Sequence, residues 1–295
     1  MCANHSGYKS STGAGLIVLA AHIGAWAVAG CSQAHAGAGQ DECTGPSEDC
    51  VAVGHWNFSV ALGAGVRTNP LMNGKDIPLV VIPQFSYYGK RFFIDNLDFG
   101  FTLSEKAANT FNLVATPGYD RVYFYRTDLQ NFFIGFPFNP STPAVVNSNT
   151  PGAVKVPPPA PRFTYLAGPE WTFKYGRLSG QLDVLHDITG QNSGDEVRAA
   201  LGIPLLESKG KVSANIGFTW KSAALVNYYY GVPKLYEGGA ALDPFIKLGY
   251  TLPLAGKWRL NAFAEMERLG SAIANSPIVA EHNVATVFVG ATYTF

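Results

Sequence analysis

The residues best suited to acid–base chemistry in this sequence lie between His186 and Ser193. Some barrel hydrolases place a His and a Ser on one strand, with a polar or acidic third residue that orients the His. Here Ser193 follows His186 by seven residues and comes after the turn-forming pair Thr189-Gly190. The two side chains therefore do not share one face of a strand. We expect an outer-loop turn at this point, and we expect the protein not to be an enzyme.

Histidine and cysteine are also poorly placed to bind metal. His55 and His282 lie near expected strand ends, away from other His, Cys or clustered acidic residues. Cys43 and Cys50 bracket a short polar segment, and such a pair in an exported chain predicts a small-loop disulfide. Metal ligation by this pair is the alternative, but no nearby His or Cys would complete a tetrahedral set. We expect no metal and no cofactor.

The first 36 residues have the pattern of an export signal. Lys9 precedes the small, apolar stretch 13–30, which is followed by an A-x-A cleavage pattern at residues 34–36. The preceding sequence VAGC resembles a bacterial lipobox, so lipidation of Cys31 is the alternative, and a retained helix is a third. Residues 37–54 are then expected to form a periplasmic N-terminal segment.

Composition excludes several classes of protein. The 295 residues carry 21 Lys and Arg against 21 Asp and Glu, so the balance of charge gives no reason to expect nucleic acid. With 47% hydrophobic and 13% aromatic residues, the chain does not resemble a disordered one. After residue 36 no apolar run reaches the roughly 20 residues that a membrane-spanning helix needs. If the protein spans a membrane, it does so with strands.

Most of the chain after His55 alternates between apolar and polar residues, which is the period of a β-strand. In residues 56–66 the even positions are all apolar, and the odd ones are polar or small. The same alternation recurs in residues 163–173, 178–187, 196–203, 211–221 and 257–267. These segments predict an all-β protein.

Short and long connections alternate between these segments. Short turns occur near residues 175–176, 207–210 and 255–256, and long loops at 118–161, 221–242 and 269–281; the Pro-rich part, 137–161, cannot be strand. This alternation is typical of an antiparallel transmembrane β-barrel of the bacterial outer membrane. A soluble sandwich or lipocalin-like barrel is the alternative. Against it, the apolar face carries aromatic residues at strand ends, as expected for interface girdles: Trp56, Trp171, Tyr175, Trp220, Tyr250, Trp258 and Tyr293.

The strand count depends on residues 90–104. Two short strands around Asn96 give twelve strands, beginning near residues 55, 77, 90, 97, 109, 162, 177, 195, 210, 243, 257 and 283. One bulged strand in that place leaves ten as the alternative, and we prefer twelve. The last strand has an unbroken apolar face that includes Tyr293 and ends on Phe295, the kind of ending that the outer-membrane assembly machinery recognises.

Several motifs, taken in order, resemble the MipA/OmpV family of outer-membrane proteins, the MltA-interacting protein and its relatives, from about residue 55 to Phe295. They are Pro83 with the downstream YGKRFF at 88–93, LHDITG at 185–190, NYYYGV at 227–232, ERLG at 267–270 and SPIV at 276–279. The Pro-rich insert and the Cys43/Cys50 segment do not resemble family features.

The resemblance implies a barrel in the outer-membrane bilayer that acts as a scaffold or adaptor, joining a murein lytic transglycosylase to a murein synthase in cell-wall remodelling. A partner on the periplasmic side would touch the short turns or residues 37–54.

A narrow channel for small solutes is the alternative function. The polar face carries charges of both signs, which in a barrel of about twelve strands can pair and fill much of the lumen. These are Arg67, Arg162, Glu170, Lys174, Arg177, Asp183, Asp187, Glu196, Arg198, Lys211, Lys247, Lys257, Arg259, Glu265 and Glu267.

One outer loop is a candidate recognition surface, because tyrosine offers rigid contact area at low entropic cost. Its residues are Asn227, Tyr228, Tyr229, Tyr230 and Gly231. The alternative is that the tyrosines pack over the barrel mouth or join the interface girdle.

Overall fold

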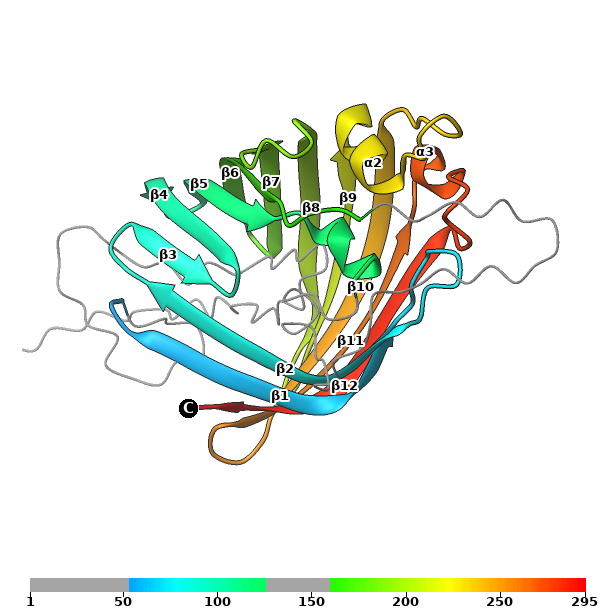
Figure 1. Cartoon of the computed structure of the whole chain (residues 1–295). Helices are drawn as coiled ribbons and strands as arrows, with labels where there is room; N and C mark the ends of the chain where they lie inside the picture. Colours follow the sequence, from blue (N-terminus) through cyan, green and yellow to red (C-terminus); the bar gives the residue numbers. More distant parts are fainter. Residues whose placement is uncertain (1–52, 126–159) are drawn as a thin grey trace, which may run out of the picture.

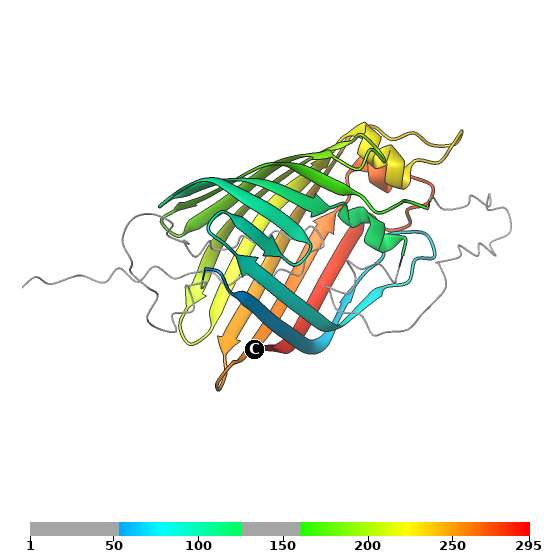
Figure 2. The same cartoon turned by 60° about the vertical axis from the view of Figure 1, so that its left-hand side comes forward.

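Twelve antiparallel strands form a closed barrel in the computed structural model, which describes residues 53–125 and 160–295 (Figures 1 and 2). In chain order the strands are β1 (Trp56–Arg67), β2 (Ile77–Tyr88), β3 (Phe92–Asp95), β4 (Asp98–Lys106), β5 (Asn109–Pro117), β6 (Tyr165–Tyr175), β7 (Leu178–Asp187), β8 (Asp195–Glu207), β9 (Lys211–Lys221), β10 (Ala241–Pro253), β11 (Trp258–Arg268) and β12 (Asn283–Thr294). Each strand pairs with the next along the chain, and β12 pairs with β1 to close the ring.

The strand count confirms the prediction of twelve rather than ten. Residues 92–106 form two strands around a tight turn at Asn96, which has a φ of 53°, a conformation that asparagine tolerates well. The Asn96 amide donates to the carbonyl of Phe85 at 2.8 Å, and its side-chain oxygen accepts from the Phe85 amide at 3.0 Å. These bonds fix the turn against β2. The short β3 pairs only with residues 86–88 of that strand.

The two faces of the wall differ as the alternation predicts. On β12 the outward side chains of Val287 and Val289 are 44% and 52% exposed, whereas the inward Thr286 and Thr292 are at most 5% exposed. Exposed apolar residues recur on the outer face of the other strands. Such a surface suits contact with lipid rather than water.

Aromatic side chains gather at the end of the barrel that carries the C-terminus. The rings of Trp56 and Phe58 stack with centroids 5.9 Å apart, and Trp258 lies 5.0 Å from Tyr293. Tyr293 in turn contacts Phe295 edge to face at 5.2 Å. This is the arrangement of an interface girdle, where amphipathic rings lie at the level of lipid head groups.

The long connections expected at the opposite end contain short helices, which the alternation did not predict. They are the 3-10 helix η1 (Tyr119–Tyr123) and the α-helices α2 (Ala223–Tyr230) and α3 (Ser271–Ala274). The hydroxyl of Ser222 caps α2 by accepting from the Leu225 amide. None of the helices in the described ranges is long and apolar enough to cross a membrane.

Two glycines face each other where the ring closes. Gly63 on β1 pairs with Gly290 on β12. A Cβ atom on Gly290 would lie 2.6 Å from the Leu62 carbonyl oxygen and 2.6 Å from Cζ of Phe288, closer than side chains approach. Glycine is therefore needed for the close approach of the two strands, and the ring of Phe288 covers the space that it leaves.

Replacing Gly290 with Val is expected to disrupt the closing seam. The added side chain forces the strands apart, at a cost of about 1–3 kcal/mol or more for an overpacked site. The measurement is the fraction of heat-modifiable, folded protein on gels. Ala291→Val, on the outward face of the same strand, is the control and should fold normally; equal folded fractions for both variants would contradict this account.

Candidate functional site

The three helices lie at one mouth of the barrel and share a buried apolar cluster with the wall (Figures 1 and 2). We call η1, α2 and α3 the plug. The cluster joins the plug to β1, β2, β10, β11 and β12 through these buried residues: Ala61, Ile77, Leu79, Ile82, Val122, Tyr123, Phe124, Leu225, Val226, Tyr229, Tyr230, Val232, Ala241, Phe263, Leu269, Ile273, Ala274, Ile278, Val279, Val284 and Phe288. The apolar contacts thus fasten the plug to one side of the ring.

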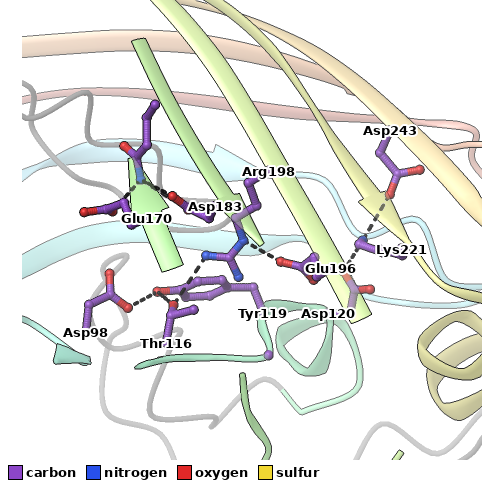
Figure 3. A network of polar contacts seen from close by, with 12 residues as sticks. Asp98, Thr116, Tyr119, Asp120, Glu170, Asp183, Glu196, Arg198, Lys221 and Asp243 are labelled. Carbon is purple, nitrogen blue, oxygen red and sulfur yellow. Dashed lines mark hydrogen bonds and ion pairs between the residues drawn. The ribbon is translucent and has the colours of Figure 1, made fainter. Parts of the chain in front are cut away.

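Polar contacts fasten η1 to the other side (Figure 3). The Tyr119 hydroxyl donates to Asp98 of β4 at 3.2 Å and accepts from Thr116 of β5 at 3.4 Å. The guanidinium of Arg198, on β8, lies 5.3 Å from the centre of the Tyr119 ring. Because β4, β5 and β8 stand opposite β10, β11 and β2 in the strand order, the plug is held from wall to wall.

Lys221, near the mouth, links three elements. Its ammonium lies 2.8 Å from Asp120 of η1 and 3.0 Å from Asp243 of β10. Lys221 is 4% exposed and Asp243 is fully buried. The second oxygen of Asp243 accepts from the Gly270 amide at 2.6 Å, at the start of α3. One cation therefore connects the barrel wall to two parts of the plug.

Arg67, on β1, contacts the last residue of η1. Its guanidinium donates to the Tyr123 hydroxyl and lies 4.8 Å from the centre of that ring. It also lies 3.8 Å from the carboxylate of Glu267. The Asn69 side chain donates to the Tyr123 carbonyl at 2.9 Å. The end of η1 is thus fixed to the connection between β1 and β2.

Inside the barrel, charged side chains of the wall contact one another, as the alternating pattern predicts. Lys247 and Glu265 form an ion pair at 3.1 Å, and Arg198 bonds to Glu196. Glu170 and Asp183 face each other on β6 and β7, and the Gln181 amide donates to both, at 2.9 and 3.1 Å (Figure 3). In the described part of the chain, no group of three or more His, Cys, Asp or Glu is placed to hold a metal.

Comparison with known proteins bears on identity. The family model for the MltA-interacting protein MipA matches residues 62–295, which is most of the chain. The chain belongs to the MipA family. A search of curated proteins gives no match.

Solved structures similar to this chain include the outer membrane channel DcaP of Acinetobacter baumannii, with 10% identity over 81% of this chain and 97% of that one, and a TM-score of 0.36. The anion-selective porin of Comamonas acidovorans has 10% identity over 81% and 98%, with a TM-score of 0.34. OmpT of Vibrio cholerae has 7% identity over 83% and 100%, with a TM-score of 0.34. As a closed barrel of the MipA family with an apolar outer face, this chain is an integral protein of the bacterial outer membrane.

The candidate recognition residues 227–231 lie at the C-terminal end of α2, within the connection between β9 and β10. Leu225, Val226, Tyr229 and Tyr230 recur at helical spacing and are at most 1% exposed. The tyrosines at 229 and 230 therefore belong to the interior of the plug.

The rest of that candidate surface is partly exposed. The Asn227 amide donates to the carbonyl of Gly238 at 2.7 Å, and the Tyr228 hydroxyl accepts from the Arg162 amide at 2.8 Å. Gly231, whose amide bonds to the Asn227 carbonyl, ends the helix. A recognition role stays a prediction, and Asn227 and Tyr228 are the side chains of the set that are exposed enough for it.

The remaining candidates are placed as follows. His186 pairs with Asp195 at 2.7 Å, while the Ser193 amide donates to Asp187 at 3.1 Å, so the described contacts do not link His186 to Ser193. Tyr293 and Phe295 lie on the outer face, and their role in assembly stays a prediction. The lipidation candidate Cys31, the disulfide candidates Cys43 and Cys50, the signal 1–36 and most of the Pro-rich segment lie outside the described residues.

Sequence reasoning missed the partners of the wall charges. The alternating pattern does not single out Asp98, Tyr119, Asp120 or Asp243, although Asp98 bonds to Tyr119, and Asp120 and Asp243 both pair with Lys221. The available signal is weak: Asp120 is an isolated acid within an aromatic stretch, and Asp243 is the third residue of β10, which follows the strand that Lys221 ends.

The plug tyrosines are expected to resist alkaline ionisation. Burial, as the largest cause, raises the pKa of Tyr229 and of Tyr230 above the ordinary value. Because their pKa is raised in the folded protein, the neutral tyrosines contribute to its stability. This contribution is fully present below about pH 10 and is lost as the pH rises further. Absorbance of tyrosinate measures it: a Tyr229→Phe/Tyr230→Phe variant should lose only the latest-titrating part of the curve. A loss in the earliest part would contradict this.

Proposed function

We propose that this protein is a non-enzymatic outer-membrane adaptor that holds murein-remodelling enzymes at the membrane. The observation that carries the proposal is the plug, which is fastened to opposite sides of the ring by apolar contacts and by buried ion pairs. A barrel built in this way is suited to be a fixed platform rather than an open pore.

The family supports the choice of partner. Its model bears the description MltA-interacting protein, and the resemblance noted above implies an adaptor between a murein lytic transglycosylase and a murein synthase. Both partners act on the cell wall, which lies on the periplasmic side. In the proposed orientation the short turns and the C-terminus face that side, and the plug faces outward.

Two measurements on the purified barrel test the proposal. In planar bilayers we expect no stable openings, because we expect the plug to obstruct the mouth at which its helices lie. Immobilised barrel should retain a murein lytic transglycosylase and a murein synthase from a membrane extract, whereas an unrelated barrel of similar size should not. Stable openings of small conductance with no retained murein enzyme would favour the alternative, a narrow channel for small solutes.

A further inference from the structure

The barrel end that carries the C-terminus has a strongly basic edge. The five short connections at this end, with two residues on either side of each, contain nine Lys and Arg and only two acids. We call the basic residues the basic rim: Lys90, Arg91, Lys106, Lys174, Arg177, Lys209, Lys211, Lys257 and Arg259; the acids are Glu105 and Glu207. The connections at the plug end carry charges of both signs.

Most of this positive charge is not neutralised by the barrel itself. Arg177 lies 3.7 Å from Glu207. Six other members of the rim are exposed and have no ion pair with any described residue: Lys90, Arg91, Lys106, Lys174, Lys209 and Lys257. A ring of like charges repels itself and attracts an anionic ligand.

The chain supplies such a ligand immediately before β1. Residues 41–50 contain four acids, Asp41, Glu42, Glu48 and Asp49, and no Lys or Arg. We propose that this acidic segment docks on the basic rim of its own barrel. The inference does not depend on which partner the barrel has.

The path of the chain into β1 favours this occupant. The Gly54 amide donates to the carbonyl of Tyr88 at 2.7 Å, so the chain enters the barrel beside the turn that carries Lys90 and Arg91. The acidic segment is therefore tethered, through Gly54, to a point beside the rim.

The reach of the segment also suffices. Glu48 and Asp41 lie six and thirteen positions before the anchored Gly54, and extended chains of those lengths span up to about 21 Å and about 45 Å. A ring of twelve strands is about 24 Å wide, from the strand spacing and tilt. The tether gives the segment a high effective concentration at the rim, an advantage that a free acidic ligand lacks.

The contacts join exposed charges, so docking is expected to be reversible and sensitive to salt. An acidic partner protein would have to displace the segment from the same lysines.

Carbodiimide cross-linking of the mature, full chain in nanodiscs tests the proposal, because this reagent joins carboxylates directly to lysine amines. In phosphatidylcholine discs we expect links from residues 41–50 to Lys90 and to other rim lysines. Lys75 and Lys234, exposed at the plug end, should not be linked. About 0.5 M salt should lower the yield at least about threefold.

A charge variant separates attraction from mere proximity. The double variant Arg91→Gln/Lys209→Gln keeps Lys90 available but lowers the positive charge of the rim. The yield of cross-links between residues 41–50 and Lys90 should therefore fall by about threefold. The matched control, Lys75→Gln with Lys234→Gln, should leave it unchanged. Heat-modifiable mobility verifies that both variants fold.

Four results would overturn the proposal. They are the absence of links to the rim, equal links to Lys75 and Lys234, links between differently isotope-labelled chains in a mixed sample, and loss of the links in phosphatidylglycerol discs. The third would mean that a second copy supplies the acids, and the fourth that anionic lipid occupies the rim.

Discussion

Replacing Lys221 with Met is expected to release the plug while the barrel stays intact. The substitution leaves the carboxylates of Asp120 and Asp243 close together without their cation. Breaking a buried ion pair by removing one partner costs about 3–5 kcal/mol. Because Asp120 and Asp243 hold η1 and the start of α3, the substitution destabilises the attachment of the plug to the barrel wall. We therefore expect conductance openings in planar bilayers that the unaltered protein lacks.

The control for this variant is Lys75→Met, which removes an exposed lysine from the same end of the barrel. It should not conduct. Adding Asp120→Asn to Lys221→Met removes one of the uncompensated charges and should restore part of the closed state. If Lys221→Met neither conducts nor lowers the temperature at which the heat-modifiable form is lost, the ion pairs do not hold the plug.

Tyr230→Ala is expected to open the mouth by a different route. The side chain is fully buried, and its ring packs against Phe124 and Tyr229, with centroids 6.0 and 6.3 Å away. Removing a buried aromatic ring costs about 3–5 kcal/mol, because the cavity left behind loses its contacts. The expected readouts are new conductance and earlier proteolysis of the connection between β9 and β10.

Tyr230→Phe is the matched variant. The Tyr230 hydroxyl is buried without a hydrogen-bond partner among the described residues, so removing it costs nothing in lost bonds. We expect this variant to be closed and as stable as the parent protein, or more stable by about 1 kcal/mol. Conductance from the Phe variant equal to that of Tyr230→Ala would show that the hydroxyl, not the packed ring, keeps the mouth closed.

The wall of the barrel could be predicted from sequence because strand periodicity is a local property. Val287 and Val289 point outward, and Thr286 and Thr292 inward, as alternation requires. The two short strands on either side of Asn96 could also be predicted, because short and long connections must alternate between the two ends of an antiparallel barrel. The largest shift is at β6, which begins at Tyr165 rather than near residue 162, while β3 and β10 each begin two residues from the expected position.

The plug could not be predicted in the same way. Its helices are short and lie in connections, and their stability comes from packing on the wall rather than from helix propensity. Leu225, Val226, Tyr229 and Tyr230 do have helical spacing, but over eight residues this signal is weak. The contact of Asp120 with Lys221 joins residues about a hundred positions apart, which no local pattern specifies.

The pairing of the first strand with the last makes insertion of this barrel an all-or-nothing event. The residues of β1 find their partners only when β12, more than two hundred positions later in the chain, has been exported and folded. A chain that lost either strand would present two rows of unpaired peptide groups to hydrocarbon, each group costing several kcal/mol. Shortened or damaged copies therefore have no stable place in the bilayer. We expect such copies to stay in the periplasm, within reach of proteases, so that only chains able to form the closing seam persist in the membrane.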